Sequence, residues 1–148
     1  RHGEYKEWYE NGQSKEESMY KEGKYDGELK RWHSNGQMST HCFKKNGITD
    51  GLYRLWYKTG QPQTEYTIGN GVKQGLYRSW YSNGVQNKIC TMKDGRQCGE
   101  CKTWYMSGLL STHSVVEDGK AIKPRKTWDS KGQLTYSSIL ANLKGGIF

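Results

Sequence analysis

The sequence predicts an all-β fold, an elongated single-layer antiparallel meander of stacked β-hairpin repeats. Two observations carry this prediction. A glycine follows every tryptophan by four residues, and another precedes each of the first five tryptophans by five residues. The tryptophans themselves recur every 24 residues, at Trp8, Trp32, Trp56, Trp80, Trp104 and Trp128. A self-similar period of this length is typical of repeat architectures.

Numbering each unit from its leading glycine divides the chain into six repeats. Five are regular and span residues 3–26, 27–50, 51–74, 75–98 and 99–122. The sixth, residues 123–146, is degenerate: Lys123 replaces the leading glycine, Asp129 stands where tyrosine usually follows tryptophan, and Leu143 replaces the later glycine. Terminal repeats of stacked arrays are atypical, so we interpret this one as a cap.

Each repeat contains two turn signals, one directly after the tryptophan and one eleven residues later. Asn11-Gly12 is an example of the first and Asn46-Gly47 of the second. Such dipeptides supply the positive φ angles of tight type I′ hairpin turns. The segments between turns are too short for helices and lack helical apolar spacing. We therefore expect one hairpin per repeat and about twelve strands.

With two-residue loops, side-chain alternation places one set of residues on an apolar face. That face holds Tyr53, Leu55, Tyr57, Pro62, Tyr66 and Ile68 in the third repeat, and Tyr77, Tyr81, Cys90 and Met92 in the fourth. The tryptophans then lie on the opposite face, unless a bulge at the leading glycine turns them inward. We expect each indole to pack structurally over the leading glycine of a neighbouring repeat.

The composition limits the possible classes of protein. Leu, Ile, Val and Phe number only 21 of 148 residues and the net charge is +8, a combination typical of disorder. Periodic glycines and 13% aromatic residues argue instead for a thin fold held together by aromatic side chains. No apolar run approaches the roughly 20 residues that cross a bilayer. The chain begins at Arg1 within a repeat, so we expect a fragment of a longer array.

A cation stands two residues before every tryptophan, and strand alternation puts the two on one face. We call this set the basic–aromatic ladder: Lys6, Lys30, Arg54, Arg78, Lys102 and Lys126, with Trp8, Trp32, Trp56, Trp80, Trp104 and Trp128. Such a stripe suits phosphate-rich partners through neutralisation and stacking. The structural alternative is that each cation covers its own tryptophan by a cation–π contact.

Four cysteines are few and irregular for a disulfide scaffold, which favours a reducing compartment. Cys98 and Cys101 form only half of a zinc motif and alternate to opposite strand faces, so we expect no metal site. Cys42 and Cys90 share a repeat position about 20 Å apart, too far for a disulfide. The histidines show no recurring Ser, Cys or carboxylate partner. We expect no catalytic residues, no cofactor and no enzymatic activity.

The pattern Gly-x-x-x-x-Trp-Tyr-x-Asn-Gly-Gln resembles the MORN repeat over essentially the whole chain. It is closest to the 24-residue variant of bacterial proteins labelled antitoxins and of arrays from large DNA viruses. Cys101 departs from the pattern at a usual aromatic position, and Val85 and Leu109 at the usual glutamine position. The resemblance implies a scaffold or interaction module, with phospholipid binding also proposed for the family, and it carries over no catalytic residue.

We therefore expect a non-enzymatic repeat scaffold that binds a partner protein along its exposed face or open sheet edge. A peripheral binder of anionic phospholipid or nucleic acid, acting through the ladder, is the first alternative. An antitoxin-like neutraliser of a partner protein is the second, and it rests on family labels alone. We expect an intracellular location in the cytoplasm or, for a viral source, in host cytoplasm or the virion, with a membrane-peripheral position as a variant.

Overall fold

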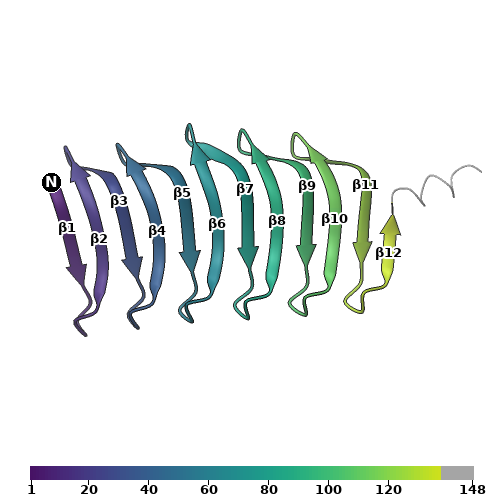
Figure 1. The fold of residues 1–148 in the computed structure, drawn as a ribbon, viewed down its shortest axis with the longest axis horizontal. Helices are drawn as coiled ribbons and strands as arrows, with labels where there is room; N and C mark the ends of the chain where they lie inside the picture. Colours follow the sequence, from purple (N-terminus) through teal and green to yellow (C-terminus); the bar gives the residue numbers. More distant parts are fainter. Residues whose placement is uncertain (138–148) are drawn as a thin grey trace, which may run out of the picture. The chain divides into compact units, whose positions relative to one another are not determined.

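The computed structural model describes residues 1–137, which form twelve consecutive β-strands (Figure 1). The first six are β1 (Gly3–Trp8), β2 (Ser14–Lys21), β3 (Lys24–Trp32), β4 (Met38–Lys45), β5 (Ile48–Trp56) and β6 (Pro62–Gly69). The other six are β7 (Val72–Trp80), β8 (Gln86–Lys93), β9 (Arg96–Trp104), β10 (Leu110–Glu117), β11 (Lys120–Trp128) and β12 (Leu134–Ser137). Every strand that carries a tryptophan ends on it.

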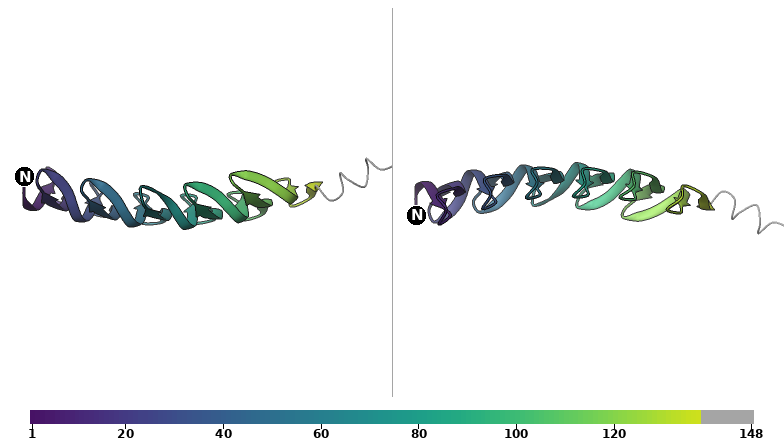
Figure 2. Two further views of the ribbon diagram at one scale, coloured as in Figure 1. Left: turned by 90° about the horizontal axis from the view of Figure 1, so that it is seen from above. Right: turned by 90° about the horizontal axis from the view of Figure 1, so that it is seen from below.

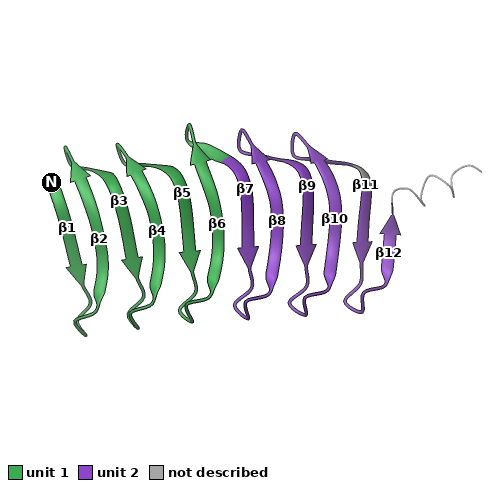
Figure 3. Ribbon diagram, in the orientation of Figure 1, with its two compact units in different colours: residues 1–73 green, residues 74–148 purple. Residues whose placement is uncertain are grey.

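The chain forms two compact units, unit 1 over Arg1–Lys73 and unit 2 over Gln74–Phe148 (Figure 3). In each unit the strands pair in the order of the chain, every pair antiparallel. The views in Figure 2 show the strands of each unit in one layer. The predicted fold class, an open antiparallel meander of consecutive hairpins, is confirmed. The boundaries of the six repeats stay a prediction.

Helices are absent from residues 1–137, and so none of the described segments could cross a membrane as a long apolar helix. The physical reason is the turn spacing. Turn glycines with positive φ interrupt the chain twice in each of the first five repeats, and the strands β1 to β11 that they bound have six to nine residues. Segments of that length, rich in Thr, Tyr and Trp, gain more from pairing with a neighbouring strand than from an isolated helical turn.

The second turn of each of the first five repeats has the predicted type I′ conformation. Both central residues have positive φ, for example 51° at Asn46 and 83° at Gly47. Glu22, the one residue at this position that is neither Asn nor Asp, also has a positive φ of 51°. The loop holds two residues, because Lys45 and Ile48 are direct cross-strand partners. The twist of this turn matches that of the paired strands.

The first turn differs from the prediction. Only its glycine has positive φ, 80° at Gly12, whereas Asn11 keeps negative φ. Gly12 N–H donates to the Tyr9 carbonyl at 2.9 Å, and Tyr9 N–H donates to the Gln13 carbonyl at 2.8 Å. This is a type I turn followed by a left-handed glycine, the usual three-residue hairpin loop. The Asn11 side chain accepts a 3.1 Å bond from Gln13 N–H, so it braces the loop instead of adopting positive φ.

The same asparagines connect successive repeats. The Asn11 amide donates to the Ser34 carbonyl at 2.7 Å, and the Asn35 amide donates to the Lys58 carbonyl at 2.7 Å. In unit 2 the Asn83 amide donates to the Met106 carbonyl at 2.9 Å. Each of these hydrogen bonds joins residues 23 positions apart, that is, in successive repeats. The asparagine of the first turn therefore contributes to repeat stacking as well as to the turn.

Two irregularities in strand pairing recur in the repeats. Near the leading glycine, the cross-strand partner of Cys90 is Cys101 while that of Thr91 is Cys98, so β9 carries two extra residues there. Next to the tryptophan, the partner steps from Leu55↔Thr64 to Trp56↔Pro62. The predicted placement of Pro62 on the apolar face is therefore wrong, since it pairs with Trp56. Positive φ at each leading glycine permits the first bulge.

In each unit one sheet face, which we call the buried face, carries most of the least exposed side chains. They include Glu16, Ser18, Leu29, Thr40 and Cys42 in unit 1 and Ser79, Cys90 and Cys101 in unit 2. Tyr53 is opposite Cys42, and Tyr77 is opposite Cys90. Short side chains thus become inaccessible in a single layer because tall aromatic rings stand beside them. The apolar face predicted from Tyr53, Leu55 and Tyr66 is this face.

A charged network lies within the buried face of unit 1. The Arg31 guanidinium Nε donates to the Glu16 carboxylate at 2.8 Å, and the hydroxyls of Ser18 and Tyr25 donate to its other oxygen at 2.9 Å each. Burial by itself raises the pKa of Glu16, but the three hydrogen bonds outweigh it and hold the pKa below 4.5. Burial raises the pKa of Tyr25, so that phenol remains a donor.

The sixth repeat begins as a normal hairpin. Asp129 N–H donates to the Gln133 carbonyl at 2.9 Å, which closes the same first turn. The Asp129 carboxylate accepts from Lys131 N–H at 2.9 Å and Gln133 N–H at 2.8 Å, the role that asparagine has elsewhere. The predicted cap beyond Ser137, including Leu143, lies outside the described residues.

We expect Gly84→Val to lower the free energy of unfolding by more than about 1 kcal/mol. Gly84 has a φ of 83° in its first turn, and a β-branched residue there costs about 1–3 kcal/mol in backbone strain. Urea unfolding of the full chain followed by tryptophan fluorescence measures the loss. Gly84→Asn is the control, since asparagine tolerates this conformation and should cost less. Equal stability of Gly84→Val and the unmodified chain would contradict the turn assignment.

Candidate interaction surface

The basic–aromatic ladder lies on the sheet face opposite the buried face, which we call the ladder face. On β1, Glu4, Lys6 and Trp8 alternate with Tyr5 and Glu7, and the cross-strand partner of Lys6 is Glu17. In unit 1 the ladder cations belong to a single row of cross-strand partners, in which each cation alternates with a residue of the neighbouring strand. The row runs Lys6, Glu17, Lys30, His41, Arg54 and Glu65. Strand alternation therefore brings these predicted cations and tryptophans onto one face.

The three ladder cations of unit 1 are all paired with glutamates. Lys6 Nζ lies 3.1 Å from Glu4, Lys30 Nζ lies 2.8 Å from Glu28, and Arg54 Nε lies 2.8 Å from Glu65. These pairs are not the cation–π cover that sequence reasoning offered as an alternative. They balance the charge of the ladder face in unit 1.

Two histidines take part in a recurring carboxylate contact, contrary to the expectation. His41 Nε2 lies 2.8 Å from Glu28, and His113 Nε2 lies 2.7 Å from Glu100. Hydrogen bonds from Lys30 and then from His41 lower the pKa of Glu28, and those from Lys102 and His113 lower the pKa of Glu100. The signal that could have revealed this is positional: both histidines occupy position 15 of their repeats and both glutamates position 2.

Unit 2 has the same row with fewer acids. The cross-strand partners run Arg78, Ile89, Lys102, His113, Lys126 and Ser137. Ile89 and Ser137 thus occupy the two positions at which unit 1 has Glu17 and Glu65. Glu100 lies 3.1 Å from Lys102 and also contacts His113. One carboxylate therefore serves two basic groups of the row.

The charge of the whole chain is divided unequally between the units. Unit 1 has twelve Lys and Arg against ten Asp and Glu, a net charge of +2. Unit 2 has eleven against five, a net charge of +6. The basic excess read from the composition belongs mainly to unit 2, where it coincides with the acid-poor ladder row.

The tryptophans are held at their strand ends by their backbone. The Tyr9 hydroxyl donates to the Trp32 carbonyl at 2.7 Å, and Tyr105 donates to the Trp128 carbonyl at 2.8 Å. Trp8 is 57% exposed, whereas the other five tryptophans are half-buried. The predicted packing of indoles over the leading glycines is wrong where it can be checked, since a Cβ added at Gly3, Gly51, Gly75 or Gly99 would meet nothing within 4 Å.

Comparison with known families agrees with this geometry. Residues 1–22, which comprise β1, its first turn and β2, match the family model described as the MORN repeat variant. The predicted resemblance is confirmed for residues 1–22, and the later hairpins repeat the turns and bulges of the matched segment. None of the curated proteins matches the chain.

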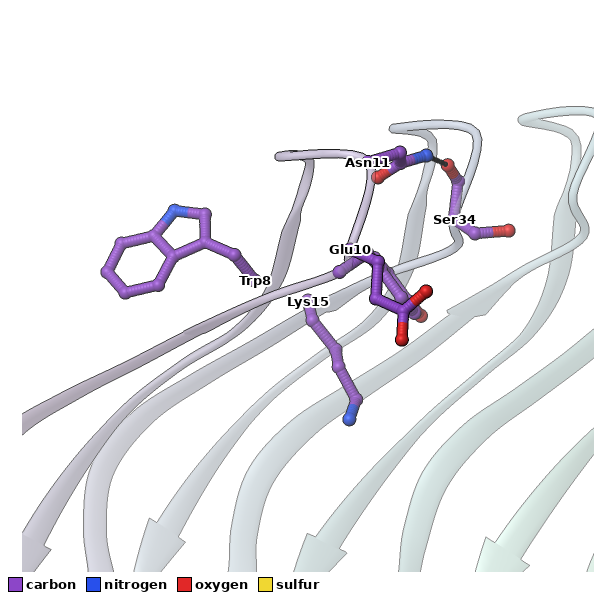
Figure 4. Close-up of a pocket in the computed structure, with 6 residues that line it drawn as sticks. Trp8, Glu10, Asn11, Lys15 and Ser34 are labelled. Atoms are coloured by element: carbon purple, nitrogen blue, oxygen red, sulfur yellow. Dashed lines mark hydrogen bonds between the residues drawn. The ribbon is translucent and has the colours of Figure 1, made fainter.

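A hollow of about 460 Å³ lies beside the first turn of the first repeat (Figure 4). Trp8, Tyr9, Asn11, Lys15 and Ser34 are among the residues that line it. Lys15 is already bonded to Glu7 at 2.7 Å, and Asn11 to the Ser34 carbonyl. In Figure 4 the Trp8 indole points away from that bond. The hollow therefore offers an aromatic surface next to satisfied polar groups.

The cysteines of the fourth and fifth repeats lie on both faces. Cys98 is opposite Thr91, whereas Cys101 is opposite Cys90 on the buried face. Within residues 1–137, no three His, Cys, Asp or Glu side chains converge as a metal site would require. Sequence reasoning missed the Cys90–Cys101 pair, because a two-residue loop without a bulge would place Gly99 opposite Cys90.

Proposed function

We propose that this chain is a non-catalytic MORN-repeat scaffold that binds another protein along the ladder face of unit 1. The family supports a scaffold or binding module. The balanced charge of that face supports a protein partner over a phosphate polymer, because Lys6, Lys30 and Arg54 are already neutralised by glutamates. A phosphate backbone would have to displace those carboxylates.

The observation that carries the proposal is a pair of exposed apolar side chains at equivalent positions on this face. Met19 on β2 and Phe43 on β4 are 41% and 46% exposed and stand one repeat apart. Each is the cross-strand partner of a glutamate, Glu4 and Glu28 respectively. Apolar side chains rimmed by charges are the usual composition of a protein-binding patch.

The backbone positions Met19 for contact. A Cβ added at Gly27 would lie only 2.9 Å from the Cβ of Met19. The side chain of Met19 therefore occupies space that is open only because residue 27 is glycine. A depression of about 120 Å³, lined by Glu4, Glu17, Met19, Glu28 and Lys30 among others, surrounds it. The patch is shallow and mixed in charge, which suits a protein surface more than a small molecule.

The test is capture of partners by the full chain from an extract of its natural source, followed by mass spectrometry. We expect at least one protein to remain bound at about 0.5 M salt, since apolar contacts are not screened. Met19→Ala with Phe43→Ala should reduce its recovery about tenfold, the usual size of a hot-spot loss. Met106→Ala is the matched control, because Met106 is 54% exposed but lies in a turn of unit 2. Equal recovery with both variants would refute the proposal.

A second candidate function is binding of anionic phospholipid or nucleic acid by the ladder of unit 2. The observation that favours it is the net charge of +6 in that unit together with the acid-poor row of Arg78, Lys102 and Lys126. Cations in register on one sheet can bind several phosphates at once, which makes weak individual contacts effective.

A further inference from the structure

Two cysteines face each other across adjacent strands of unit 2. Cys90 on β8 and Cys101 on β9 are direct antiparallel partners on the buried face. Residues opposite each other in an antiparallel pair have Cα atoms about 4.5–5.5 Å apart. A disulfide requires about 4.4–6.8 Å between Cα atoms, so the backbone already has the geometry for a cross-link.

The pairing depends on the bulge at the leading glycine of the fifth repeat. Gly99 has a φ of 73°, and with Glu100 it forms the two-residue insertion that places Cys101 opposite Cys90. An added Cβ at Gly99 would meet no atom within 4 Å, so the conformation and not crowding requires glycine there. The two thiols therefore face each other for two reasons: the bulge at Gly99, and a cysteine at position 101, where the repeat usually has an aromatic residue.

Cys42 provides an internal comparison. It occupies the same repeat position as Cys90 and is equally inaccessible, at 0% against 1% exposure. Its cross-strand partners are Leu29 and Tyr53, so it has no second thiol beside it. Burial raises the pKa of the Cys42 thiol. Cys42 therefore represents the ordinary role of a buried cysteine as a small apolar side chain.

The surroundings of the pair are different. A hydrogen bond from Cys90 lowers the pKa of Cys101 to about 7 against the opposing effect of burial, with the charge of Lys88 assisting. Cys101 is 6% exposed, and its thiol lies 3.9 Å from the Gln97 side-chain oxygen. The Cys90 sulfur lies 3.8 Å from the Met92 sulfur. Cys101 is the more accessible member, and a thiol with a lowered pKa is the more reactive form of cysteine.

We propose that Cys90 and Cys101 form an oxidation site, in which a small hydroperoxide converts the two facing thiols into a disulfide that cross-links β8 to β9. The Cys101 thiolate sulfur attacks one oxygen of hydrogen peroxide, the O–O bond breaks, and the hydroxide that leaves takes up the proton released by the Cys101 thiol, which gives a sulfenic acid and one water. The Cys90 sulfur then attacks the Cys101 sulfur, the S–O bond breaks, and water leaves with the Cys90 proton. Two thiols are oxidised, and one hydrogen peroxide is reduced to two waters.

The cross-link acts on the strand that carries ladder residues on its other face. Lys102 and Trp104 follow Cys101 on β9, one and three residues later. A disulfide would hold the bulge at Gly99 in one register, and register decides which residues of β9 face which way. Oxidation on the buried face would thereby stiffen part of the ladder face.

The experiment is peroxide titration of the full chain near pH 7, followed by blocking of free thiols, trypsin digestion without reduction, and mass spectrometry. Cleavage at lysine and arginine separates residues 89–93, which contain Cys90, from residues 97–102, which contain Cys98 and Cys101. We expect these two peptides to be joined, with a mass loss of two hydrogens that dithiothreitol reverses. The cross-link should form on the order of tenfold faster than Cys42 is oxidised, since a pKa near 7 leaves far more thiolate.

Two variants distinguish the outcomes. Cys98→Ser should keep the cross-link, because Cys98 lies opposite Thr91, whereas Cys101→Ser should abolish it. The cross-linking rate should also rise with pH through a midpoint of about 7. A bond between Cys98 and Cys101, which leaves residues 89–93 free, would overturn the proposal. So would oxidation of Cys42 at the same rate as the pair.

Discussion

Changing Arg78, Lys102 and Lys126 together to glutamine is expected to lower the affinity of the chain for anionic phospholipid vesicles or single-stranded oligonucleotide about tenfold at low salt. Each exposed charge contact contributes about 0–1 kcal/mol, and three of them together approach the 1.4 kcal/mol that corresponds to a factor of ten. All three cations lie in the row of unit 2 in which Ile89 and Ser137 replace acids. The slope of affinity against salt should also become shallower.

The measurement is vesicle co-sedimentation and oligonucleotide anisotropy at about 50 and 200 mM salt, the range in which phosphate contacts weaken steeply. The matched control is Lys6, Lys30 and Arg54 changed together to glutamine. That variant removes the same charge from cations that glutamates already neutralise in unit 1. An equal loss in both variants would mean that net charge alone drives binding. No binding by the unmodified chain at low salt would leave only the protein-scaffold function.

Glu16→Ala is expected to lower the free energy of unfolding by about 2 kcal/mol, the usual cost of losing hydrogen bonds to a buried charged group. The change leaves the Arg31 guanidinium and the hydroxyls of Ser18 and Tyr25 without their common acceptor. Hydrogen exchange of β2 and β3, together with urea unfolding, measures the loss. Glu17→Ala is the control, because Glu17 is the next residue but lies on the ladder face, and it should cost less than about 0.5 kcal/mol.

The same carboxylate predicts part of the acid sensitivity of the chain. The pKa of Glu16 is depressed below 4.5 in the folded state, so its contribution is fully present above pH 4.5 and is lost as pH falls through the depressed folded value. Glu16→Gln should therefore show a smaller loss of stability than the unmodified chain as pH falls below 4.5. Identical pH profiles for the two proteins would show that the network does not hold the carboxylate in its charged form.

Several features of the fold could be predicted because their causes are local. A left-handed backbone at Gly47 or Gly84 follows from the residue and its neighbour, so the turns could be placed from sequence. Alternation along a strand needs no partner, so Lys6 and Trp8 could be assigned to one face. The type of the first turn could not be predicted, because Asn11 and Asn46 form the same dipeptide with glycine but adopt φ of opposite sign.

The candidate surface was predicted in outline and missed in detail. The positions of the ladder cations follow from the repeat, but their pairing with Glu4, Glu28 and Glu65 depends on which side chains stand beside them. The prediction for Pro62 is wrong because a bulge beside Trp56 changes its cross-strand partner. The residue pattern of one strand read alone contains no signal for that bulge. An ion pair or a bulge depends on how two strands pair, whereas sequence periodicity describes the residues of one strand.

What the sequence by itself determined was the repeat, the all-β class, the turn sites and the composition of the two faces. All of these depend on backbone preferences and on a period of two residues within one strand. What only the tertiary structure decided was the register between strands. Two extra residues at Gly99 bring Cys101 opposite Cys90, and neighbouring strands bring Arg31 and Tyr25 to the buried carboxylate of Glu16. Register is set by hydrogen bonds between strands, and those bonds exist only once the chain is folded.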